Sequence, residues 1–240
     1  MSGGGDDGRG VHVKSSERDS ATLAGARVVV NAGPTYEDID PVRFLGNRSS
    51  GKMGFAIAEA ASLAGAEVTL VAGPVALATP AKGGLRVDVR SALQMRDAVL
   101  EAVRGADIFI ATAAVADWRV AEYSSHKIKK GTRGAPALEL VENPDILAEV
   151  AALDPRPFVV GFAAETERVA ERARKKLERK KLDMLVANLV DEHVGIGADD
   201  NAVEVFWPGG SEALPRASKT EIAEALVARI ARRFQARGAA

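Results

Sequence analysis

The chain alternates short, apolar, β-branched runs with longer amphipathic segments, and this alternation constrains its fold more than any other feature. Apolar runs of about four to eight residues are typical of strands buried on both faces of a sheet. The predicted strands are residues 27–31, 67–72, 107–113, 158–163 and 184–188, and the predicted helices begin near residues 50, 91, 144, 167 and 219. We therefore expect an α/β fold: a three-layer, Rossmann-like, mostly parallel sheet with helices on both faces.

Capping residues mark the starts of several predicted helices. Ser49 or Ser50 can cap the first helix, and Ser91 can cap the second. Asn143 precedes Pro144, which predicts a third helix that runs to about residue 153. Ligands of such sheets bind at the carboxyl ends of the strands, so we expect functional residues in the loops that follow the strands.

Three segments depart from the alternation. Residues 202–206 and 212–214 read as a β-hairpin at one edge of the sheet. Residues 117–142 are charged and rich in glycine, which indicates a mobile flap. Residues 1–23 show no hydrophobic period, so we expect a disordered tail or remnant linker ahead of one domain over residues 24–240.

Composition excludes several classes of protein. Lys and Arg total 32 against 33 Asp and Glu, so no strongly positive field is present to bind nucleic acid. Cysteine is absent, which excludes disulfides, thiolate metal sites and cysteine nucleophiles. No apolar stretch approaches the roughly 18 residues of a membrane span. We expect a cytoplasmic protein with no nucleic-acid or membrane partner.

Residues Gly46 to Lys52 match the opening of a phosphate-binding P-loop, G-x-x-x-x-G-K. The match fails at Met53, because a thioether is a poor ligand for Mg²⁺, and the preceding strand ends far upstream at Asn31. Free amides at the helix start over residues 49–51 suit an anion, and a plain serine cap explains the same residues equally well. A P-loop NTPase or kinase is one alternative hypothesis, and a non-catalytic nucleotide-binding module is another.

Further candidates follow the later strands. Asp117 comes after the small residues 111–116, where a flat ring could approach the backbone, although a turn-closing Asp explains it too. Lys127 lies in a lysine cluster suited to closing over a polyphosphate or to solvation alone. The lysine pairs of residues 175–181 offer similar contacts. The three histidines are scattered without metal-ligand spacing, so the metal ligands stay unknown.

Six segments together carry a resemblance to a known family. They are AGPTYEDIDPVRFLGNRSSGKMGFAIAEAA, AAVADWR, KIKK, ENPDILA, VGFAAET and KKLDMLVAN, in this order along the chain. The chain resembles the phosphopantothenoylcysteine synthetase family, which forms one half of bifunctional bacterial proteins of coenzyme A biosynthesis. The resemblance covers residues 24–237.

The resemblance implies a two-step ligase reaction. The carboxylate of 4'-phosphopantothenate attacks the α-phosphate of CTP, which gives an acyl-cytidylate and pyrophosphate. The amine of L-cysteine then displaces CMP and forms an amide, with Mg²⁺ accompanying the nucleotide. Positioning and charge neutralisation would then be the protein's main contributions.

The resemblance implies roles for the residues that match the family's motifs. Asn47, Arg43 and the flap residue Lys127 are implied as catalytic. Besides the helix-start residues Ser49, Ser50 and Gly51, the expected nucleotide contacts are Ala111, Thr112, Ala113, Asp117, Lys127, Pro144, Asp145, Ile146, Leu147, Phe162, Lys176 and Lys180.

The resemblance also implies partners. The family forms homodimers with the acyl substrate near the subunit interface, and a flavin-dependent decarboxylase domain is normally fused ahead of this region. We expect no flavin on this chain, because the decarboxylase region has no counterpart in it.

Overall fold

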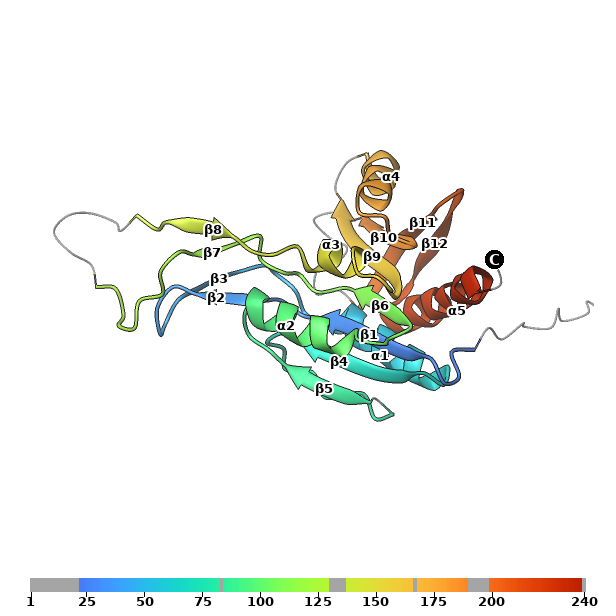
Figure 1. The fold of residues 1–240 in the computed structure, drawn as a ribbon, viewed down its shortest axis with the longest axis horizontal. Coiled ribbons are helices and arrows are strands. Elements are labelled where there is room, and N and C mark those ends of the chain that lie inside the picture. Colours follow the sequence, from blue (N-terminus) through green and yellow to red (C-terminus); the bar gives the residue numbers. More distant parts are fainter. Residues whose placement is uncertain (1–21, 83, 130–136, 166–167, 190–198, 239–240) are drawn as a thin grey trace, which may run out of the picture.

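A computed structural model describes residues 22–82, 84–129, 137–165, 168–189 and 199–238. Its central feature is an eight-stranded sheet with the strand order β12-β11-β10-β9-β6-β1-β4-β5 (Figure 1). The strands are β1 (Arg27–Ala32), β4 (Glu67–Ala72), β5 (Leu85–Asp88), β6 (Ile108–Ala111), β9 (Phe158–Glu165), β10 (Met184–Leu189), β11 (Asp200–Trp207) and β12 (Gly210–Ser218). The six neighbouring strands β5, β4, β1, β6, β9 and β10 are parallel, and β11 and β12 add an antiparallel edge.

Helices cover both faces of this sheet, as the alternation predicted. They are α1 (Lys52–Leu63), α2 (Ala92–Ala102), α3 (Ile146–Ala151), α4 (Val169–Arg179) and α5 (Lys219–Gly238). Alternate residues of each strand feed two cores: Val28 and Val30 join the core beneath α1 and α5, and Val29 joins the core beneath α2, α3 and α4. The predicted three-layer, mostly parallel, Rossmann-like fold is confirmed.

A narrow projection, which we call the arm, extends from the carboxyl ends of the central strands (Figure 1). It consists of two antiparallel pairs and their connections: β2 (Tyr36–Asp38) with β3 (Phe44–Gly46), and β7 (Trp118–Val120) with β8 (Leu140–Glu142). The sequence predicted only a loop between the first strand and Ser50, and this was wrong because three-residue strands are too short for a detectable period. Of the predicted flap, residues 130–136 lie outside the described part of the chain.

Two predicted helix caps were also wrong. Gly51, not Ser49 or Ser50, caps α1 with a φ of 74°, a left-handed conformation that a residue without Cβ adopts readily. Asp145, not Asn143, caps α3 through the N–H of Ala148, and α3 ends at Ala151. The Ser91 cap is confirmed: its hydroxyl accepts from the Gln94 N–H, and the Ser91 N–H donates in return to the Gln94 side-chain oxygen.

Other elements differ from prediction at their ends. The hairpin of β11 and β12 lies at the sheet edge as predicted, but both strands are longer. Strand β5 was not predicted. Leu23, assigned to the tail, is 2% exposed and packs in the core beneath α1, while residues 1–21 lie outside the described part. Within the described residues, no helix is long and apolar enough to cross a membrane.

Candidate functional site

Two adjoining cavities open where the central strands end. One, of about 520 Å³, is lined by the start of α3, and we call it the α3 pocket. The other, of about 560 Å³, is lined by the start of α1, and we call it the α1 pocket. Both are lined by Ala113, Ala114, Asp117, Phe162 and Lys176, so the two cavities form one continuous site. This is the position at which open α/β sheets bind ligands.

Two buried polar side chains and one half-buried one hold the segment that follows β6 and lines both pockets. The side-chain oxygen of Asn31 accepts hydrogen bonds from the backbone N–H groups of residues 112–113 at 2.9 and 3.1 Å. The Thr35 hydroxyl accepts one from the Ala116 N–H at 3.0 Å, and the Asn143 amide donates to the Ala116 carbonyl oxygen at 2.9 Å. Asn143 therefore uses its side chain to shape the site, which is why it does not cap α3.

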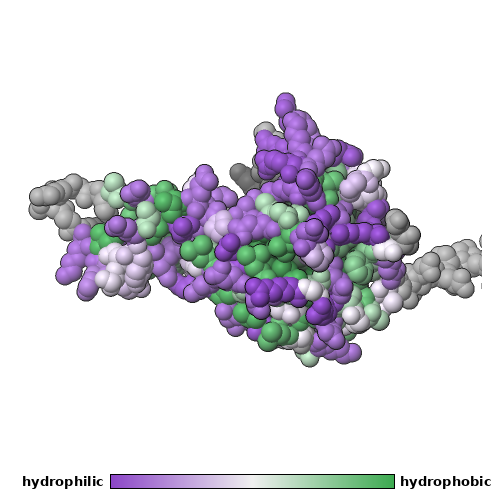
Figure 2. All heavy atoms as spheres, in the orientation of Figure 1, coloured by the Kyte–Doolittle hydropathy of each residue, from purple (hydrophilic) through white to green (hydrophobic). Residues whose placement is uncertain are grey.

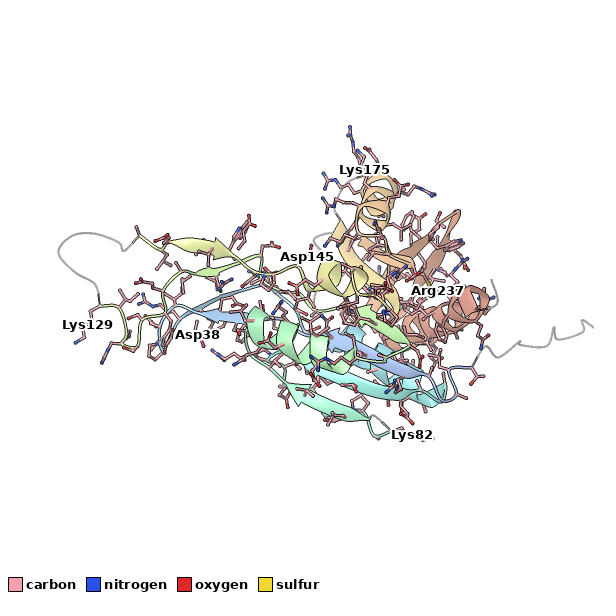
Figure 3. All side chains as sticks on the ribbon, viewed as in Figure 1. Asp38, Lys82, Lys129, Asp145, Lys175 and Arg237 are labelled. Carbon is pink, nitrogen blue, oxygen red and sulfur yellow. The ribbon has the colours of Figure 1, made fainter. Side chains whose placement is uncertain are left out.

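The α3 pocket carries two lysines beside a carboxylate. The Lys180 ammonium lies 2.6 Å from Asp145 Oδ2, and Lys176 donates to the Phe162 carbonyl oxygen at 2.9 Å. Burial raises the pKa of the Asp145 carboxyl, but hydrogen bonds from Lys180 and the Ala148 N–H outweigh it and leave the pKa below its usual value. The aspartate is therefore charged at neutral pH and orients Lys180 at the edge of the pocket. In Figure 3, Asp145 lies at the junction of the arm and the body.

Close packing shapes the start of α1 in the α1 pocket. A Cβ on Gly54 would lie 2.2 Å from the Thr112 hydroxyl and 2.6 Å from the Ala32 Cβ, so only glycine lets the helix approach the sheet this closely. Ahead of it, Asn47 donates from its amide to the Val115 carbonyl oxygen at 2.9 Å. The loop before α1 follows β3 of the arm rather than a central strand, which is not P-loop geometry.

Most predicted site residues line one of the two pockets. The α3 pocket takes in Ala111, Ala113, Asp117, Pro144, Asp145, Ile146, Leu147, Phe162, Lys176 and Lys180. The α1 pocket takes in Asn47, Ser49, Ser50, Gly51, Thr112, Ala113, Asp117, Phe162 and Lys176.

Arg43 and Lys127 line neither pocket. Both lie on the arm, where the Arg43 guanidinium bonds to the buried Asp40 carboxylate and to the Ile128 carbonyl oxygen. Lys127 is exposed, and its neighbour Lys129 lies near the far end of the arm in Figure 3.

Several site residues were not identified from sequence patterns. These are Asn31 and Asn143 in the α3 pocket, and Asn188, Asn201 and Lys219 in the α1 pocket. Lys52, which also lines the α1 pocket, was considered only as part of the P-loop match. One signal was available: the apolar runs of β1 and β10 both reach an Asn, in VVVN and LVAN. The Asn188 side-chain oxygen is buried and has no hydrogen-bond partner among the described residues. No group of three or more His, Asp or Glu side chains that could hold a metal ion occurs in the described part of the chain.

An open, mostly parallel sheet with a continuous site of two pockets at its strand ends places the chain in the class of Rossmann-like α/β proteins. The model of the DNA/pantothenate metabolism flavoprotein C-terminal domain family matches residues 23–234, and the chain belongs to this family.

Curated relatives of similar sequence are named coenzyme A biosynthesis bifunctional protein CoaBC. The protein from Vibrio cholerae is 51% identical over 208 residues, covering 85% of this chain and 52% of the relative. The protein from Escherichia coli K12 is 50% identical over 211 residues, covering 86% of this chain and 52% of the relative. The chain thus spans about half the length of the curated relatives that it matches.

Solved structures share the fold. The crystal structure of the C-terminal domain of a CoaBC protein has a TM-score of 0.75 at 39% identity, covering 90% of this chain and 98% of that domain. A DNA/pantothenate metabolism flavoprotein from Streptococcus pneumoniae has a TM-score of 0.74 at 23% identity, covering 86% of this chain and 98% of that one. A Cab2 variant in complex with phosphopantothenate-cysteine has a TM-score of 0.70 at 20% identity, covering 90% and 89%.

Proposed function

We propose that this chain is a phosphopantothenate–cysteine ligase of coenzyme A biosynthesis that uses CTP. The observation that carries the proposal is the continuous site of two pockets, which gathers Asn47, Asp117 and Lys176 from distant parts of the chain. The names of the bacterial relatives and the phosphopantothenate-cysteine bound to Cab2 support this substrate class. A cytoplasmic location and an N-terminal decarboxylase in the same pathway are parts of the same proposal.

The nucleoside of CTP would occupy the α3 pocket. The small side chains at residues 111–114 leave the backbone open to a flat base, and Asp117 can accept from ribose hydroxyls. Lys176 and Lys180 stand at the same pocket and would bind phosphate oxygens. The two lysines thus indicate the side of the pocket from which the triphosphate would extend beyond the nucleoside.

The reaction would take place where the two pockets meet. A carboxylate oxygen of 4'-phosphopantothenate bonds to the α-phosphorus of CTP, and the bond to the β-phosphate breaks and releases pyrophosphate. The amine of L-cysteine then attacks the acyl carbon, and CMP leaves with the electron pair. Asn47 can stabilise the oxyanion with its amide, and Mg²⁺, which prefers phosphate and water oxygens, would enter bound to CTP.

A second copy of the chain would complete the site. The arm exposes a set of large apolar side chains: Val42, Phe44, Trp118, Tyr123, Leu138 and Leu140. Figure 2 shows hydrophobic surface on the arm, away from the body. Exposed apolar patches of this kind mark interfaces. We infer a homodimer in which Arg43 and Lys127 on one arm act at the pockets of the other subunit, because neither lines a pocket of its own chain.

The test is pyrophosphate release by the purified protein with Mg²⁺ and 4'-phosphopantothenate. CTP and ATP are compared, each with and without cysteine. We expect release that requires CTP and the acyl substrate, with sustained turnover only when cysteine is added. Release with ATP alone would overturn the CTP assignment, and nucleotide binding without consumption would identify a binding module instead.

A further inference from the structure

Lys219 is a buried cation that lines the α1 pocket. It is the first residue of α5, it is 8% exposed, and its ammonium lies 3.3 Å from the Asp200 carbonyl oxygen. The amino end of a helix carries partial positive charge, so a lysine there is placed against the helix dipole. Burial adds a desolvation cost. A cation in the wall of a cavity makes the local potential positive and therefore favours an anionic ligand there.

A second lysine reinforces the positive charge. Lys52 is the first residue of α1, lines the same pocket, and contacts the Asp199 carboxylate at 2.6 Å. Helices α1 and α5 pack together, so two helix starts with their lysines face one cavity. Of the nearby carboxylates, that of Asp200 is bonded to Arg216 at 2.7 Å. Burial first, and then the charge of Lys52, lowers the pKa of the Lys219 amine, and Asp199 and Asp200 oppose this.

The arrangement of the two adjoining pockets indicates which anion Lys219 would bind. The nucleoside-sized α3 pocket and the α1 pocket meet at Asp117, Phe162 and Lys176. A nucleotide whose base lies in the α3 pocket therefore extends its phosphates toward α1 and α5. We propose that Lys219 binds the β- and γ-phosphates of the nucleotide and neutralises the pyrophosphate that leaves. This rests on the proposed function, which names CTP as the nucleotide.

The chemistry of the first step explains the need for this cation. When the bond between the α-phosphorus and the bridging oxygen breaks, the electron pair moves to pyrophosphate. A cation at the far end of the chain of phosphates stabilises this developing charge, and it makes no contact with CMP, which lacks those phosphates. Lys219 should therefore distinguish CTP and pyrophosphate from CMP.

The experiment measures binding of CTP, CMP and inorganic pyrophosphate, each with Mg²⁺, by calorimetry on the full chain. Lys219→Met removes the charge but keeps the length, and Lys219→Arg restores a cation. Lys175→Met is the matched control, because Lys175 pairs with Glu171 on the outer side of α4, away from the pockets (Figure 3). We expect Lys219→Met to weaken CTP and pyrophosphate at least about tenfold and CMP less than about twofold.

Thermal unfolding provides the second measurement. Without ligand, we expect the Lys219→Met melting temperature to equal or exceed that of the wild type, because a desolvated charge has been removed. The stabilisation by pyrophosphate should be lost and should return in Lys219→Arg. Equal weakening of CTP and CMP, or unchanged pyrophosphate binding, would overturn the proposal. If wild-type protein binds these ligands but releases no pyrophosphate from CTP, the proposed ligase function is wrong. The binding measurements on the Lys219 variants still test whether Lys219 binds the β- and γ-phosphates.

Discussion

At the scale of single residues, the shape of the site depends on polar side chains that bond to the backbone of the segment after β6. Asn31, Thr35 and Asn143 come from three distant segments and bond to residues 112–116. These bonds satisfy backbone groups of the segment that lines both pockets. The motif residues Asn47 and Asp117 could be identified from the sequence, but this supporting set could not, because nothing local indicates which backbone an amide will reach.

Replacement of Asn31 tests this support. Asn31→Ala leaves the Ala113 N–H without its acceptor and leaves the Thr112 N–H only its longer bond to the Asn31 backbone carbonyl oxygen, so we expect a loss of about 2 kcal/mol in the free energy of unfolding. Urea unfolding measures the loss, and CTP affinity should fall in parallel. Asn31→Asp keeps the acceptor and is expected to retain most of the stability. A loss in Asn31→Ala within 0.5 kcal/mol of zero, about the spread of neutral surface changes, would contradict this role.

At the scale of elements, two features were beyond sequence prediction. Helix α1 was predicted to begin near residue 50, but its glycine cap and its close approach to β1 depend on the sheet beneath it. The arm was predicted as a loop because its three-residue strands are too short to show a period. Its two strand pairs are also joined by packing of β2 against β7, between segments about 80 residues apart that no local pattern connects.

Gly54 tests the close approach of α1. Gly54→Ala would place a methyl group against Thr112 and Ala32, so the helix must shift. We expect a loss of about 2 kcal/mol in stability from this overpacking, together with weaker nucleotide binding. Gly238→Ala, near the end of α5 where a Cβ meets nothing within 4 Å, is the control and should be neutral. Equal stability of the two variants would show that α1 can move without cost.

Replacement of Asp40 tests whether its carboxylate stabilises the arm. Its buried carboxylate bonds first to Arg43, and also to the N–H groups of Val42 and Ile128, and these bonds hold the pKa of Asp40 well below its usual value of about 4. A lowered folded-state pKa contributes stability that is present above about pH 4 and is lost as the pH falls toward the folded-state pKa.

The expected result is a pH-dependent difference between wild type and Asp40→Asn. Wild type should be more stable at pH 7, and the difference should shrink as the pH falls below about 4. Fluorescence of Trp118, on the arm, measures urea unfolding in a Trp207→Phe background. Asp97→Asn, an exposed carboxylate on α2, serves as control. A difference that stays constant with pH would argue against the carboxylate as the cause.

At the scale of the whole molecule, Arg43 and Lys127 line neither pocket of their own chain, and this separation is the basis of the proposed shared site. Motif matches predict that these residues act together with Asn47, and the structure shows that both lie on the arm. A symmetric dimer explains both observations, because each arm can then reach the pockets of the other subunit.

Mixed dimers test the shared site. Arg43→Ala and Asn47→Ala should each be inactive alone. Random mixing of the two forms some dimers in which one site has both native residues, so activity should recover to about a quarter of wild type. Ligase assays after denaturation and refolding of the mixture measure this recovery. No recovery from a mixture shown to contain heterodimers would place Arg43 and Asn47 at a site within one chain.

The sequence by itself determined the alternation of strands and helices, the Ser91 cap, the edge hairpin and the motif residues that line the pockets. These features depend on periodicity and capping, which are local. Only the tertiary structure decided that Lys219, at the start of the last helix, faces the start of the first helix, and that Arg43 and Lys127 lie outside their own pockets. The physical reason is that such proximity depends on strand order and helix packing, which join residues far apart in the chain.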